Sequence, residues 1–139
     1  MKSNFRRFLT FSVLLWAVTM VGQANKPPAD APKYDLRSEV TVKGKVEEVQ
    51  KVANAKGQVG IHLLVKTETA TLEVRLCPNS FLDDMDVRFA KGDALTITGS
   101  KVKVEEKDVI LAREIERGTS KIVLRDKEGV PVWLWLVKG

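Results

Sequence analysis

Residues 71–99 read TLEVRLCPNSFLDDMDVRFAKGDALTITG, and this stretch decides the fold. Its first part alternates apolar and polar side chains as far as Pro78, which is the period of a β-strand with one buried face. The spacing then becomes helical, with Ser80 in the position of a helix cap, until Gly92 and Asp93 end the segment. The stretch therefore predicts a strand, a short helix and a second strand. The predicted helix face consists of Phe81, Leu82, Met85 and Phe89.

Further alternating segments lie on both sides of this stretch. Residues 40–52 predict a first strand whose buried phase slips after Val46, as at a β-bulge. Residues 59–67 predict a second strand, and residues 109–116 predict a fifth; Gly99 marks a similar slip in the fourth. The order β-β-β-α-β-β predicts an all-β fold, a five-stranded OB-type barrel. A small β-sandwich is the alternative, and the helix after the third strand argues against it.

Residues after the fifth strand predict an extension of the barrel. Residues 121–137 predict a sixth strand, a turn and a seventh strand, which together form a C-terminal β-hairpin. The domain would then span residues 39–137. The seventh segment contains Trp133 and Trp135 in an unbroken apolar run. Such a run is either buried on both faces or available to a partner, so the two tryptophans are candidates for core or for docking.

The N-terminal region predicts export. Residues 1–24 have the basic start, the apolar run and the small residues before a cut that are typical of a signal peptide. The apolar run at residues 8–21 is shorter than the roughly 20 residues that a spanning helix needs. We therefore expect a periplasmic or secreted protein with no stable membrane span after cleavage. Residues 25–38 contain three prolines and predict an extended, flexible spacer.

Charge and cysteine content exclude some classes of protein. Cleavage of the signal peptide removes three basic residues and no acidic one, which lowers the net charge from +5 to +2. A polyanion as partner therefore gains little support from the composition. Cys77 is the one cysteine of the chain, so no intramolecular disulfide can form in an oxidising compartment.

Several short motifs resemble those of a known family. The motifs are residues 60–63, 74–78, 91–93, 98–100, 112–114, 124–126 and 129–133, and the last two are the most specific. Together they are similar to small exported bacterial OB-like domains, such as the domain of magnetosome proteins S and X, over about Glu39 to Trp135. The resemblance implies the fold and export, and it implies no settled activity. In this family pattern a second His and a Gly often stand where this chain has Arg75 and Cys77.

His62 is the one histidine and lies in the outward phase of the second strand. Antiparallel pairing with the third strand places it opposite either Arg75 or Cys77, and the residues leave both registers open. Beside Cys77, the imidazole and a thiolate would offer two ligands to copper or zinc. Two ligands are fewer than a stable zinc site uses. We therefore expect no resident cofactor, with a metal site at His62 and Cys77 as the alternative.

The sequence contains no set of residues that predicts catalysis. Cys77 has Arg75 and a helix start nearby, but no second His or Asn completes a nucleophile set. Binding of single-stranded nucleic acid needs aromatic platforms on the second and third strands of an OB barrel. His62 supplies the one ring among their outward positions, and Glu73 would repel phosphate.

We therefore predict an exported, non-enzymatic binding module of the cell envelope, with a protein or a small ligand as its partner. The predicted binding residues are His62 and Arg75 on the barrel face, or Trp133 and Trp135 at the C-terminal end. A metal- or haem-linked redox accessory protein and a protein that binds single-stranded nucleic acid are the two alternatives.

Overall fold

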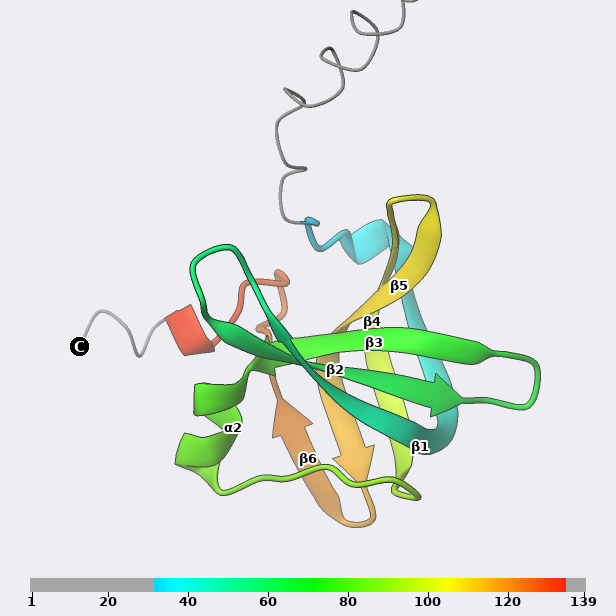
Figure 1. Ribbon diagram of the computed structural model, residues 1–139. Coiled ribbons are helices and arrows are strands. Elements are labelled where there is room, and N and C mark those ends of the chain that lie inside the picture. The colour runs from blue at the N-terminus through cyan, green and yellow to red at the C-terminus, as the bar shows by residue number, and fades with distance from the viewer. Residues whose placement is uncertain (1–31, 135–139) are drawn as a thin grey trace, which may run out of the picture. The chain divides into compact units, whose positions relative to one another are not determined.

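The computed structural model describes residues 32–134, in which six strands and one short α-helix form a mostly β fold (Figure 1). The predicted all-β class is confirmed at this level. Residues 1–24 and Trp135 lie outside the described residues. The strands are β1 (Glu39–Ala53), β2 (Val59–Lys66), β3 (Thr71–Pro78), β4 (Ala94–Val104), β5 (Lys107–Arg117) and β6 (Ser120–Val123); α2 (Asn79–Met85) lies between β3 and β4, and the 3₁₀ helix η2 (Leu36–Ser38) precedes β1.

The six strands form one sheet in which five strands are paired on both sides. Antiparallel pairing gives the order β3-β2-β1-β4-β5-β6, and β3 also pairs in parallel with β5. The pairings of β1, β2, β3, β5 and β4 therefore form a closed ring. One edge of β5 pairs with β4, while its other edge pairs with β3 over Val109–Leu111 and with β6 over Glu114–Arg117.

Two register shifts allow the long strands to bend. The first half of β1, Glu39–Lys45, pairs with β4, and its second half pairs with β2. The register of β1 against β2 shifts between Val46 and Glu48, as the sequence predicts. The register of β4 against β5 shifts between Thr98 and Gly99, which confirms the second predicted slip. A β-bulge increases local twist, so both shifts help each strand to reach two neighbours.

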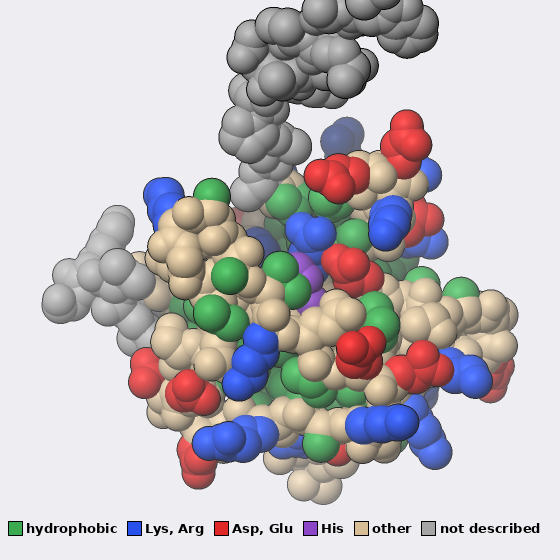
Figure 2. Space-filling view, in the orientation of Figure 1, with side chains coloured by type: hydrophobic (Ala, Val, Ile, Leu, Met, Phe, Trp, Pro, Cys, Tyr) green, Lys and Arg blue, Asp and Glu red, His purple; other side chains and the backbone are tan. Residues whose placement is uncertain are grey.

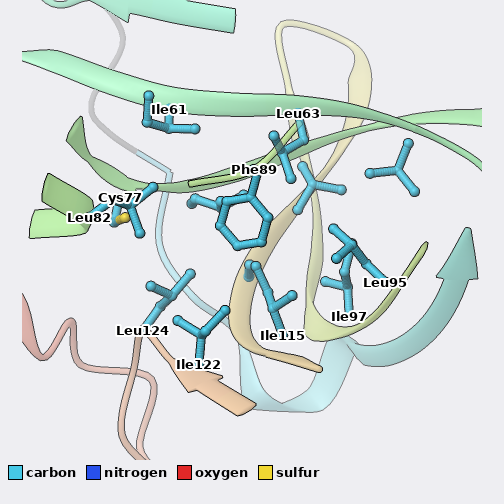
Figure 3. Close-up of a cluster of buried hydrophobic side chains, with 14 of the residues drawn as sticks. Ile61, Leu63, Cys77, Leu82, Phe89, Leu95, Ile97, Ile115, Ile122 and Leu124 are labelled. Carbon is cyan, nitrogen blue, oxygen red and sulfur yellow. The ribbon is translucent and has the colours of Figure 1, made fainter. Parts of the chain in front are cut away.

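The apolar core lies on the inner face of this ring (Figure 3). Alternate residues of β2, namely Ile61, Leu63 and Val65, are almost completely buried, as predicted. The helix α2 adds Phe81 and Leu82 to the same cluster. Its other buried members are Val46, Val74, Leu76, Cys77, Phe89, Leu95, Ile97, Ile110, Ala112, Ile115, Ile122 and Leu124.

The predicted helix is shorter than its apolar spacing suggests. It ends at Met85, because Asp86 adopts a left-handed conformation with φ 58°. Phe89 therefore reaches the core from the connection after the helix, and Met85 is exposed. The prediction that Ser80 caps the helix is wrong, since Pro78 occupies the cap position and no side chain caps the helix.

The predicted seventh strand does not form over residues 130–134. This part of the chain makes only an isolated bridge between Arg125 and Pro131. Proline has no N–H to donate to a strand ladder, and the backbone bends after Pro131, where the Leu134 N–H donates to the Pro131 carbonyl. After β6 the C-terminal extension consists of turns, the isolated bridge and a helical stretch at Trp133 and Leu134. None of the helices in residues 32–134 is long and apolar enough to cross a membrane.

Gly99 is a position where the bent sheet leaves no room for a side chain. A Cβ atom there would collide with the Leu111 carbonyl oxygen and lie 2.9 Å from Cγ2 of Ile110. We expect Gly99→Ala to lower the free energy of unfolding by about 2–4 kcal/mol, measured by urea denaturation. Gly60→Ala is the matched control, because its Cβ would meet its nearest atoms at 3.8 Å, and it should change stability by less than about 1 kcal/mol. Equal losses in both variants would contradict this explanation.

Candidate functional site

The strand register brings four residues into one row on the outer face of the sheet. Gln50 on β1 pairs with His62 on β2, His62 pairs with Arg75 on β3, and Arg75 pairs with Leu111 on β5. Paired residues point to the same face of a sheet. The open choice of register is therefore settled: His62 lies opposite Arg75, and Cys77 lies opposite Ile61.

A second row lies beside the first. Leu64 on β2 pairs with Glu73 on β3, and Glu73 pairs with Val109 on β5. Val109 and Leu111 are buried although they belong to the outward phase of β5, whose inward residues Ile110 and Ala112 enter the core. The two rows therefore place polar side chains next to an apolar floor. We call this surface the His62 face; it consists of Gln50, His62, Leu64, Glu73, Arg75, Val109 and Leu111.

Three polar groups meet at the centre of the His62 face. The Arg75 Nε donates to Oε2 of Glu73 at 2.9 Å, and the His62 Nδ1 lies 3.9 Å from the same oxygen. Burial, helped by the positive charge of Arg75, lowers the pKa of His62, while Glu73 acts in the opposite direction. The lowered pKa favours the neutral imidazole, in which one nitrogen donates and the other accepts. With Glu73 and Arg75 in a pair, the centre carries no net charge.

Cys77 is not part of this surface. Its side chain belongs to the core cluster, and burial raises the pKa of its thiol to about 12. A metal ligand or nucleophile has to be a thiolate, and the register does not bring Cys77 beside His62. Within residues 32–134 no group of three or more His, Cys, Asp or Glu side chains is arranged to hold a metal ion.

Trp133 packs in a stack of aromatic rings and one guanidinium. Its ring centroid lies 6.0 Å from that of Phe81, and the Arg125 guanidinium lies 5.6 Å from the Trp133 ring and 5.3 Å from the Tyr34 ring. The Arg125 Nη1 also donates to the Gly129 carbonyl at 2.8 Å. This cation–π stack joins the segment before β1 to the segment after β6. Trp133 therefore has a structural role, whereas nothing is described for Trp135.

Trp133 and Phe81 also line a hollow of about 700 Å³ next to α2. The hollow lies on a different part of the domain from the His62 face, and none of its lining residues belongs to that face. It is lined by Gln58, Val59, Pro78, Asn79, Ser80, Phe81, Asp83, Asp84, Trp133 and Leu134.

Some residues of these surfaces are missing from the sequence-based prediction. Val109 and Leu111 belong to a run of four apolar residues at 109–112, which signals a strand buried on both faces. That signal could have identified the floor. Tyr34, by contrast, falls in the predicted spacer, yet its hydroxyl donates to Glu39, whose carboxylate also accepts two hydrogen bonds from Arg113. No local pattern indicates the contact with Arg113, since that residue lies 74 positions from Glu39 in the chain.

The single histidine gives a direct test of the electrostatics of the His62 face. In an NMR titration, His62 should show a pKa below its ordinary value of 6.5. Arg75→Gln should raise this pKa, because it removes a positive charge, and Glu73→Gln should lower it further. An unshifted pKa, or shifts of the opposite sign in the two variants, would contradict the described cluster.

The same pKa shift predicts how stability depends on pH. The folded chain holds the imidazole less protonated than the unfolded chain does. His62 should therefore make the free energy of unfolding fall as the pH drops below about 6.5. A His62→Gln variant should lose this component of the pH dependence and keep the loss that carboxylates cause at lower pH.

A protein-family model matches the part of the chain that forms most of the sheet. The model of the MamS/MamX magnetosome protein family matches residues 38–122, which is more than half of the chain. The matched stretch includes His62, Glu73 and Arg75, while Arg125 and Trp133 lie beyond it. No curated protein matches the chain. The match confirms the family resemblance, although the motifs at residues 124–126 and 129–133 lie beyond the matched range. The chain belongs to the MamS/MamX magnetosome protein family.

Proposed function

We propose that this chain is an exported, non-enzymatic OB-type binding module of the cell envelope, which binds a protein or a small ligand on its His62 face. The OB-type assignment is supported by the closed ring of five paired strands and by α2, which lies between β3 and β4. Both features are typical of a five-stranded OB barrel. Export, with a periplasmic or secreted location, is supported by the signal-like residues 1–24 alone.

The single observation that carries this proposal is the row Gln50, His62, Arg75 and Leu111 across four strands. OB barrels bind ligands on the face of their second and third strands, between the loops that join strands one and two and strands four and five. Here those loops are residues 54–58 and 105–106. Figure 2 shows the purple histidine partly visible at the surface, between charged and hydrophobic side chains.

The chemistry of the face favours a ligand with polar, uncharged groups and an apolar part. Neutral His62 offers one donor and one acceptor, and the Glu73–Arg75 pair offers both as well. Leu64 is partly exposed beside them and supplies apolar surface, whereas Val109 and Leu111 are buried. A polyanion fits this face poorly, because the carboxylate of Glu73 lies at its centre. A metal- or haem-linked role would need ligands from a partner, since Cys77 is in the core.

A capture experiment in the native cell envelope tests the proposal. We expect the double variant His62→Ala, Arg75→Ala to capture at least about tenfold less cross-linked partner or ligand than the wild type. Truncation removes the central contacts of the His62 face. Thr41→Ala is the matched control: Thr41 is exposed on β1 and lies opposite Thr98 on β4, away from the His62 face. Far-UV dichroism and melting show first that each variant folds.

Two results would contradict the proposal. The first is equal capture by the wild type and the folded double variant, which would move binding away from the His62 face. The second is stoichiometric metal in the purified protein that His62→Ala removes, which would favour the redox accessory protein. Salt-sensitive affinity for oligonucleotides would instead favour nucleic-acid binding.

A further inference from the structure

The hollow beside Trp133 combines an apolar wall with an acidic rim. Its apolar wall includes Val59, Phe81 and Leu134 as well as Trp133. Val59 and Leu134 are large apolar side chains that remain 37% and 48% exposed. Unburied apolar area of this kind is stabilised when another apolar group covers it.

The rim next to this wall is acidic. Asp83 and Asp84 on α2 line the hollow and are exposed. Neither forms an ion pair with another residue of the described range 32–134. Figure 2 shows acidic side chains on the part of the surface where Figure 1 places α2. A group that fits the hollow therefore needs apolar side chains followed by a positive charge.

The chain itself carries such a group directly after the hollow. Leu134 lines the hollow, and the next residues are Trp135, Leu136, Val137 and Lys138, which lie outside the described residues. Three apolar side chains followed by a lysine match the apolar wall and the acidic rim. The anchored ring of Trp133 fixes the point from which this segment leaves.

The length that residues 135–138 can span is comparable to the length of α2, which borders the hollow. Trp133 and Leu134 are helical. The four residues after them span about 6 Å if they continue the helix and at most about 14 Å if they are extended. The seven-residue helix α2 is about 10 Å long, at 1.5 Å per residue. Leu134 lines the same hollow as Asp83 and Asp84, so a segment that leaves from Leu134 in an extended form is long enough to reach this rim.

We propose that residues 135–138 of the same chain occupy this hollow, with the apolar side chains against the wall and Lys138 facing Asp83 and Asp84. The segment then completes the C-terminal end of the domain, and Trp135 contributes to its packing. Any partner that uses the hollow has to displace this segment first. The inference does not depend on the His62 face, so either proposal can fail without the other.

Disulfide trapping in the full chain tests the proposed occupant. Ser80→Cys on the hollow is combined with Val137→Cys, while Cys77 stays in place because its thiol is buried. We expect rapid formation of an intramolecular disulfide under mild oxidation, since a docked segment holds the two thiols at a high effective concentration. The control pairs Val137→Cys with Thr119→Cys in the exposed turn between β5 and β6, and it should form this bond far more slowly.

Each other result would overturn the proposal. Disulfide-linked dimers in place of the intramolecular bond would assign the hollow to a second copy. Equal rates in the Ser80 and Thr119 pairs, or no trapping in either, would show that the segment does not dock there.

The charge part of the proposal has its own readout. Lys138→Glu should slow trapping by about two- to fivefold, the range expected for an exposed ion pair. Lys138→Arg should leave the rate unchanged, and high salt should reduce the difference between the variants. Equal trapping by Lys138→Glu and the wild type at low salt would overturn the assignment of Lys138 to the acidic rim.

Discussion

The arrangement of the domain depends on a short parallel contact between β3 and β5. Three residue pairs make this contact: Glu73 with Val109, Val74 with Ile110, and Arg75 with Leu111. Without it, the strands would form an open sheet with β3 at its edge. With it, β1, β2, β3, β5 and β4 form a closed ring. The same three pairs place Arg75 and Glu73 beside apolar residues of β5, so the core and the His62 face share one origin.

Close backbone approaches make this closure possible. At Gly44, where β1 passes from β4 to β2, a Cβ atom would lie 2.5 Å from the Lys66 carbonyl oxygen. Gly99 is equally tight against β5. Outside the ring, Arg125 stacks between Tyr34 and Trp133 and joins the segments that flank the sheet. The ring and this stack together determine where the two proposed binding surfaces lie.

Local patterns in the sequence predicted most strands and both bends, because alternation and glycine-linked slips are local properties of the chain. They did not predict the β3–β5 pairing, since nothing near Val74 or Ile110 indicates a partner so far away. The register at His62 stayed open for a related reason: it depends on the irregularity between Ile61 and His62. The prediction of a seventh strand was wrong. An apolar run does not reveal that Pro131 and the bend after it interrupt the hydrogen-bond ladder of a strand.

The candidate site was only partly predictable. His62 and Arg75 were identified from the outward phases of their strands, and the structure places them side by side. Cys77 was grouped with them because a strand pattern does not show how deeply a residue near a strand end is buried. The sequence left open whether Trp133 belongs to the core or to a docking surface. In the structure Trp133 packs on Phe81 and Arg125 and also lines a hollow. Such double roles depend on tertiary packing.

Native-state hydrogen exchange, followed amide by amide, tests the central claim that the β3–β5 contact closes the ring. The hydrogen-bonded amides of residues 73–75 and 109–111 should exchange only through global unfolding, with the same free energy as amides of core residues such as Leu63 and Ile97. If β3 and β5 instead open at a much lower free energy while β1–β2 and β4–β5 stay protected, the sheet is open at this edge. The shared origin of the core and the His62 face would then be contradicted.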